Sequence, residues 1–189
     1  MGYFITITGP TGSGKSTIAK RLLEVIPCTH LVTSLTTRHQ CDDDLPGEYM
    51  YVSKSDLDKI DAQNGYLWRV THGEFEYATP TLSVDKVLQR EGSIGVMILV
   101  PEAVGWLREH VEQTRGEERK VLSLFIMPVP SSILVKRLRT RPTWRKALKK
   151  MESESRWLSS ARASGIPFTF INNSGPLSAT IVAIRSLLP

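Results

Sequence analysis

The sequence is poor in cysteine and contains no long apolar run. Its two cysteines, Cys28 and Cys41, are too few for a disulfide scaffold, and their spacing matches no metal motif. This usage is typical of a reducing compartment, so a cytoplasmic location is expected. No stretch approaches the roughly 18–20 apolar residues of a membrane span, and the N-terminus lacks the basic start of a signal peptide. No association with a membrane is expected.

Acidic residues are missing from one long segment, residues 119–151, although this segment carries ten lysines and arginines. The whole chain of 189 residues has a net charge of +5. A basic block of this kind implies a polyanionic partner, either the phosphates of a nucleotide or the backbone of a nucleic acid. A solvated basic helix face is the alternative interpretation.

Residues 9–17 read Gly-Pro-Thr-Gly-Ser-Gly-Lys-Ser-Thr and match the phosphate-loop pattern G-x-x-x-x-G-K-[ST] in full. The motif follows a strand-like run and precedes an amphipathic helix, which is the context in which backbone amides bind phosphate oxygens. Lys15 is expected to stabilise the transferred phosphoryl group and Ser16 to bind Mg²⁺. The predicted cofactors are therefore ATP and Mg²⁺. The candidate nucleotide-binding residues are Gly9, Thr11, Gly12, Ser13, Gly14, Lys15, Ser16 and Thr17.

Strand-like and helix-like segments alternate along most of the chain. Predicted strands cover residues 3–8, 31–35, 49–52, 65–70, 74–78, 94–100, 121–127 and 168–171. Predicted helices cover residues 16–25, 54–60, 82–90, 102–113, 131–139, 144–163 and 176–188. The alternation predicts an α/β fold with a mostly parallel sheet, in the three-layer form of a P-loop protein.

The order of motifs resembles guanylate kinase and its relatives over roughly residues 3–188. After the phosphate loop, residues 34–38 (Ser-Leu-Thr-Thr-Arg) are similar to that family's S-x-T-T-R motif, and residues 48–53 (Glu-Tyr-Met-Tyr-Val-Ser) to its D-Y-x-F-V-S element. Residues 77–80 (Tyr-Ala-Thr-Pro) resemble the end of H-G-N-Y-Y-G-T-P, and residues 136–141 (Lys-Arg-Leu-Arg-Thr-Arg) resemble the R-L-x-x-R segment of the lid.

The resemblance implies a role for each matching residue. The acceptor would be bound by Ser34, Arg38, Tyr49, Tyr77 and Thr79, with the arginine as a bidentate partner of its phosphate. Arg137 and Arg141 would join Lys15 as catalytic cations when the lid closes. The resemblance also implies one kinase domain. Residues 1–37 and 82–135 would form its core, 38–81 a small acceptor-binding insertion, 136–150 a short basic lid and 151–189 the C-terminal part of the core.

Three departures from the family pattern concern the acceptor. The second arginine expected after Arg38 is missing, and residues 39–44 read His-Gln-Cys-Asp-Asp-Asp instead. The glutamate that reads guanine is absent from residues 66–69, and the strand that should end in an aspartate pair has Glu102 as its nearest carboxylate. Discrimination by hydrogen bonding needs such polar partners, so GMP is in question as the acceptor. The candidate replacements are Asp43, Asp44, Glu74 and Glu76.

Three functions are compatible with these motifs. The first is a nucleoside monophosphate kinase that moves the γ-phosphoryl group of ATP to an acceptor nucleotide. The second is a P-loop kinase acting on another acceptor, such as a ribose phosphate, a modified nucleotide or a nucleic acid, with Asp43 or Asp44 as general base. The third is a binding module without catalysis, which the intact Lys15 and Ser16 disfavour. The oligomeric state is left open.

Overall fold

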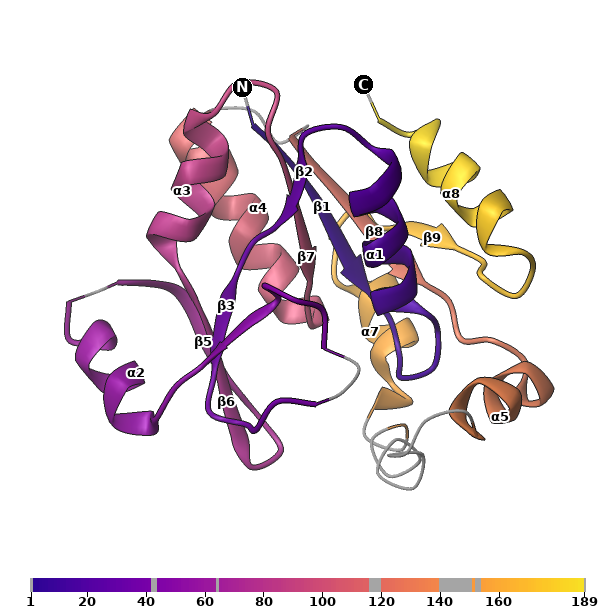
Figure 1. The fold of residues 1–189 in the computed structure, drawn as a ribbon, viewed down its shortest axis with the longest axis horizontal. Coiled ribbons are helices and arrows are strands. Elements are labelled where there is room, and N and C mark those ends of the chain that lie inside the picture. The colour runs from indigo at the N-terminus through magenta and orange to yellow at the C-terminus, as the bar shows by residue number, and fades with distance from the viewer. Residues whose placement is uncertain are drawn as a thin grey trace.

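A computed structural model describes residues 2–41, 44–63, 65–115, 120–139, 151 and 154–188. Its main sheet has five strands in the order β2-β7-β1-β8-β9, and every neighbouring pair is parallel. The strands are β1 (Tyr3–Thr8), β2 (Thr29–Leu31), β7 (Ile94–Ile98), β8 (Val121–Ile126) and β9 (Thr169–Ile171). Helices lie on both sides of this sheet (Figure 1). The α/β fold with a mostly parallel sheet is confirmed.

Two hydrophobic cores form because alternate residues of each strand point to opposite faces. Ile5 on β1 packs with α1 (Lys15–Val25) and α8 (Leu177–Arg185) on one face. Phe4, one residue earlier, packs on the other face with α3 (Thr81–Gln89), α4 (Pro101–Arg115) and α7 (Trp157–Ala163). Both residues are fully buried. The strands are apolar on both faces because helices cover both.

A second, four-stranded sheet lies beside the first, with the order β4-β3-β6-β5. Its strands are β3 (Ser34–Thr36), β4 (Tyr49–Tyr51), β5 (Tyr66–His72) and β6 (Phe75–Pro80). Helix α2 (Lys54–Asp61) covers one face, where Leu57 packs against Leu35 and Ala78. The opposite face therefore carries Ser34, Thr36, Tyr77 and Thr79, which alternate with these apolar residues.

The predicted strand over residues 31–35 was wrong. Residues 29–31 form β2 of the main sheet and residues 34–36 form β3 of the second sheet. The chain changes partners between them, because Val32 N still donates to Val96 O whereas Ser34 N donates to Glu48 O. One apolar run therefore serves two sheets.

The long helix predicted over residues 144–163 is described only in part. Ser155 and Arg156 form a turn, and α7 covers Trp157–Ala163, so the helix is not continuous over its described part. Residues 144–150, 152 and 153 lie outside the described ranges.

Helix α5 (Ser131–Arg139) leads towards the predicted lid, of which residues 136–139 are described. The division of the chain into core, insertion and lid remains a prediction. None of the helices described is both long and apolar enough to span a bilayer.

Candidate functional site

The phosphate-loop residues join the carboxyl end of β1 to the N-terminus of α1. Gly9 and Gly14 have φ angles of 147° and 101°, in the region that favours glycine. A Cβ atom on Gly9 would lie 2.3 Å from Ile126 O, and one on Gly14 would lie 2.4 Å from Asn173 Nδ2. The loop therefore packs closely against the end of β8 and the residues after β9. It leads into the start of α1, where N–H groups without helical partners can bind anions.

Lys15 lies over the beginning of the same loop. Its Nζ donates to Gly9 O at 2.6 Å and to Pro10 O at 3.2 Å. Ser16 and Thr17 follow it in the first turn of α1, and Ser13 is buried below. The loop thus holds one ammonium group beside a run of oriented backbone amides.

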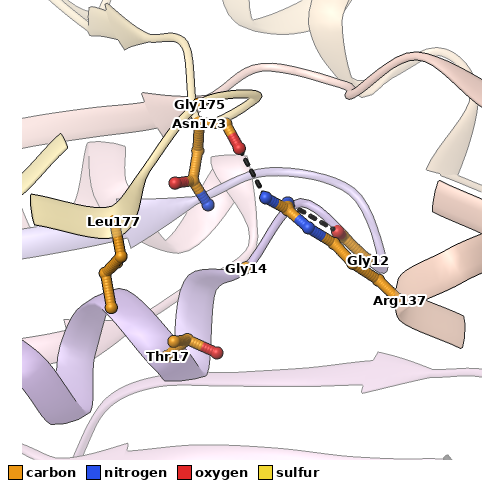
Figure 2. A pocket seen from close by; sticks show the side chains of 7 residues that line it. All are labelled: Gly12, Gly14, Thr17, Arg137, Asn173, Gly175 and Leu177. Atoms are coloured by element: carbon orange, nitrogen blue, oxygen red, sulfur yellow. Dashed lines mark hydrogen bonds between the residues drawn. The ribbon is translucent and has the colours of Figure 1, made fainter. Parts of the chain in front are cut away.

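Arg137 reaches the phosphate loop from α5. Its Nη1 donates to Gly12 O at 3.3 Å and its Nη2 donates to Asn173 O at 2.6 Å (Figure 2). The same Nη1 also donates to Ser13 O at 3.1 Å. These contacts bring Arg137, the first of the two arginines assigned to the predicted lid, to the phosphate loop. The second, Arg141, lies outside the described residues.

A cavity of about 280 Å³ opens beside these residues. Figure 2 shows Arg137 on one side of it and Leu177 and Thr17 on the other, with Asn173 above. The lining residues are Gly12, Gly14, Thr17, Arg137, Asn173, Gly175 and Leu177. The mixture of backbone, cation and apolar side chain suits part of a nucleotide rather than a free phosphate.

Asn173 and Glu154 support the loop, and no motif in the sequence assigned either of them a role. Asn173 Nδ2 donates to Ser13 O at 2.8 Å, while its Oδ1 accepts from Thr180 at 3.0 Å. The buried Glu154 carboxylate accepts the Thr11 N–H. The end of β9 and the segment before α7 therefore both hold the loop in place.

The second sheet brings the predicted acceptor residues together on the face opposite α2. Ser34 Oγ and Thr79 Oγ1 lie 2.7 Å apart and share a hydrogen bond. The rings of Tyr49 and Tyr77 meet edge to face, with centroids 6.0 Å apart, and the Arg38 guanidinium lies 4.8 Å from the centre of the Tyr49 ring. The five residues thus form one polar and aromatic cluster, in which Thr79 is fully buried and the other four are partly exposed. This cluster is called the acceptor face below.

Arg38 is held by an acidic neighbour. Its Nη1 donates to Asp44 Oδ2 at 2.7 Å and its Nη2 to Asp44 Oδ1 at 2.5 Å, so the pair is bidentate. Burial raises the pKa of Asp44, but the hydrogen bonds from Arg38, Cys41 N and Tyr51 outweigh it and leave this pKa below its ordinary value. Asp44 is consequently ionised at neutral pH.

Glu48 lies next to this cluster and is 9% exposed. Burial raises its pKa above the ordinary value, although the hydrogen bond from Leu45 N at 3.1 Å acts in the opposite direction. Burial also raises the pKa of Tyr49 well above its ordinary value, and the charge of Glu48 adds to this shift. Tyr49 therefore stays a neutral phenol at neutral pH.

Comparison with known proteins agrees with this geometry. The family model of guanylate kinase matches residues 2–188. The chain belongs to the guanylate kinase family. It is 31% identical over 141 residues to the guanylate kinase of Helicobacter pylori 26695, covering 74% of the chain and 64% of that protein. It is 32% identical over 142 residues to the guanylate kinase of Rhizobium meliloti 1021, covering 74% of the chain and 61% of that protein.

The chain therefore spans less than two thirds of the length of these guanylate kinases. A solved guanylate kinase from Anaplasma phagocytophilum has a TM-score of 0.67 and 20% identity, covering 98% of the chain and 84% of that structure. This likeness shows the shared fold.

The carboxylates named as replacements for guanylate kinase residues have different surroundings. Glu76 faces α2, where it forms ion pairs with Arg69 and Lys54. Glu74 is exposed, as is Glu102 in the first turn of α4. Asp43 lies outside the described residues. Of the three candidate replacements that the structure describes, Asp44 is the one in contact with Arg38.

The segment expected to read the base carries an apolar side chain here. Trp68 on β5 pairs in register with Thr79 on β6, and it is 6% exposed because it packs into the core beside α4. The Ser34–Thr79 hydroxyl pair therefore has an indole as its neighbour across the strands. The family pattern places a guanine-reading glutamate in this segment, residues 66–69.

Proposed function

We propose that this chain is an ATP-dependent nucleoside monophosphate kinase, which transfers the γ-phosphoryl group of ATP to the phosphate of an acceptor nucleotide. The observation that carries the proposal is the combination of a complete phosphate loop with a separate acceptor face. A phosphotransferase needs two phosphate-binding places, since catalysis comes from holding donor and acceptor in line and neutralising charge.

On the donor side, the proposal assigns the triphosphate of ATP to residues 9–17. The glycine positions that exclude a Cβ atom and the adjoining cavity support this fit. Lys15 and Arg137 would neutralise charge on the transferred group, and Arg141 would join them from the lid. The Ser16 hydroxyl would hold Mg²⁺, which would supply further charge neutralisation there.

On the acceptor side, the proposal assigns the monophosphate to Arg38 and Tyr77, with Tyr49 beneath the guanidinium. Ser34 and Thr79 would bind the rest of the nucleotide through their hydroxyl groups. GMP is the acceptor to test first, because the relatives above are named guanylate kinases. The indole of Trp68 beside Thr79 makes the choice of base an experimental question.

We propose in addition that residues 38–81 act as the acceptor-binding insertion and residues 136–150 as a lid. The position of Arg137 at the phosphate loop supports the second assignment. Closure of a lid excludes water from the transferred phosphoryl group and so prevents hydrolysis of ATP.

The test is ADP formation from Mg-ATP with the ribo- and deoxynucleoside monophosphates. We expect Lys15→Ala to lower kcat by about 10²-fold or more, because it removes a preorganised positive charge from the transition state. The matched control is Lys20→Ala on the exposed side of the same helix, which should keep wild-type kinetics. Normal turnover by the Lys15 variant, or no acceptor used by the wild type, would refute the proposal.

A further inference from the structure

Asp44 lies at the edge of the acceptor face, among several hydrogen-bond donors that would also suit an oxyanion. Its two carboxylate oxygens accept from Nη1 and Nη2 of Arg38, from Tyr51 Oη at 2.7 Å and from the backbone N–H of Cys41 at 2.8 Å. A guanidinium fork, a phenol and a backbone amide are also the donors that bind a phosphate monoester. The carboxylate therefore takes hydrogen bonds that an acceptor phosphate would require.

The fork formed by Nη1 and Nη2 of Arg38 is occupied while this contact persists. Beyond Asp44, its Nη1 donates to His39 O at 3.1 Å and contacts Cys41 Sγ at 3.1 Å. The guanidinium also lies against the ring of Tyr49, which blocks one of its faces. Only 14% of the Arg38 side chain and 9% of the Asp44 side chain are exposed. A second anion cannot bind the same fork beside Asp44.

Charge leads to the same conclusion. Arg38 and Asp44 together carry no net charge, and the neighbouring Glu48 is a further acidic group. The site therefore offers no net positive charge to an anion. A phosphate monoester carries between one and two negative charges at neutral pH. Binding it next to an ionised carboxylate is unfavourable, because like charges in a partly buried site are weakly screened.

We propose that Asp44 is an internal competitor for Arg38, so that an acceptor phosphate binds the Nη1–Nη2 fork only by displacing the Asp44 carboxylate. This inference rests on the proposed function, since it assigns Arg38 to the acceptor. Asp44 then determines specificity: a bare phosphate monoester binds weakly, and an acceptor needs further contacts, such as those at Ser34 and Thr79, to displace the carboxylate.

The decisive variant is Asp44→Asn. Asparagine keeps an oxygen for the N–H of Cys41 but removes the charge that holds Arg38. We expect the Kd for GMP and for ribose 5-phosphate, a monoester without a base, to fall about tenfold or more by titration calorimetry. The acceptor KM should fall in parallel while the ATP KM stays constant. Asp58→Asn is the matched control, because it breaks an Asp–Arg pair on the opposite face of the same sheet.

The opposite role makes the opposite prediction. If Asp44 positions Arg38 for the acceptor, Asp44→Asn will bind both monoesters as weakly as the wild type or more weakly, and the proposal is overturned. Asp44→Ala serves as a second variant should the first fail to fold. In an Arg38→Ala background, Asp44→Asn should leave the Kd for both monoesters unchanged, because Asp44 then has no arginine to compete for.

The binding measurement separates this inference from the proposed function. If no variant transfers a phosphoryl group but Asp44→Asn still tightens monoester binding, the kinase assignment fails and the competition stands. If transfer occurs and the affinities do not change, the kinase assignment stands and the competition fails.

Discussion

Arg38 is the side chain on which the proposed acceptor site depends most directly. It lies against Tyr49 and beside Tyr77, and it is the described cation of the acceptor face. We expect Arg38→Ala to raise the acceptor KM by about tenfold or more and to leave the ATP KM unchanged, because a bidentate phosphate contact is lost on one side only. Steady-state kinetics with each substrate varied in turn measures both constants.

Arg69 offers a control within the same sheet. It is also ion-paired, with Asp58, Asp61 and Glu76, but it faces α2. Arg69→Ala should lower stability and leave the acceptor KM as it is. An equal rise of both KM values in the Arg38 variant would remove Arg38 from the acceptor site.

The sequence predicted the roles of individual residues where these residues lie within one short, contiguous motif. The glycine spacing predicted the loop around Lys15, and the motif resemblance named Tyr77 and Thr79, which lie on one face of β6 in the structure. The supports of the loop could not be predicted in this way. Glu154 lies 143 residues from Thr11, and Asn173 lies 160 residues from Ser13. Neither contact leaves a periodic signal in the chain.

At the scale of elements, predictions held where one segment has one set of partners. The strand at residues 3–8 and the helix at residues 131–139 agree with β1 and α5. The strand at residues 31–35 was wrong, because an apolar pattern specifies an extended chain without saying which sheet pairs with it. The hydrogen bonds of Val32 and Ser34 to different partners decide that division.

The start of α2 allows one measurement at this scale. Ser53 is the N-cap of this helix, and its Oγ accepts from Asp56 N at 3.2 Å. Ser53→Ala should lower the free energy of unfolding by about 1 kcal/mol, since one N–H at the helix start loses its partner. Urea denaturation measures the difference. Ser186→Ala, which removes a hydroxyl near the end of α8, should change stability by less, and an equal loss would contradict the capping role.

At the scale of the whole molecule, two neighbouring carboxyl groups act on stability in opposite directions. Folding lowers the pKa of Asp44, so its contribution is present above the unfolded pKa and is lost as the pH falls through the folded one. Folding raises the pKa of Glu48, because burial disfavours its charged form. The folded protein then binds the Glu48 proton more tightly than the unfolded chain does, and stability decreases as the pH rises.

Glu48→Gln should therefore become more stabilising, relative to the wild type, as the pH rises from the ordinary glutamate value of 4.5 towards neutrality. Glutamine keeps an oxygen for the N–H of Leu45 and cannot ionise, so the variant avoids the cost of a buried charge. Melting temperatures of both proteins between pH 4.5 and 7 test this.

Glu76→Gln provides the control of opposite sign. Arg69 and Lys54 lower the pKa of Glu76, so the contribution of this carboxylate to stability is already present above pH 4.5. The change in melting temperature caused by Glu76→Gln should therefore stay constant over the same pH range. If the melting temperatures of the Glu48 variant and the wild type also differ by the same amount at every pH, Glu48 ionises as readily in the folded protein as in the unfolded chain. The acidic cluster around Arg38 would then be open to water, and Asp44 would compete with an acceptor phosphate far less than its buried contacts imply.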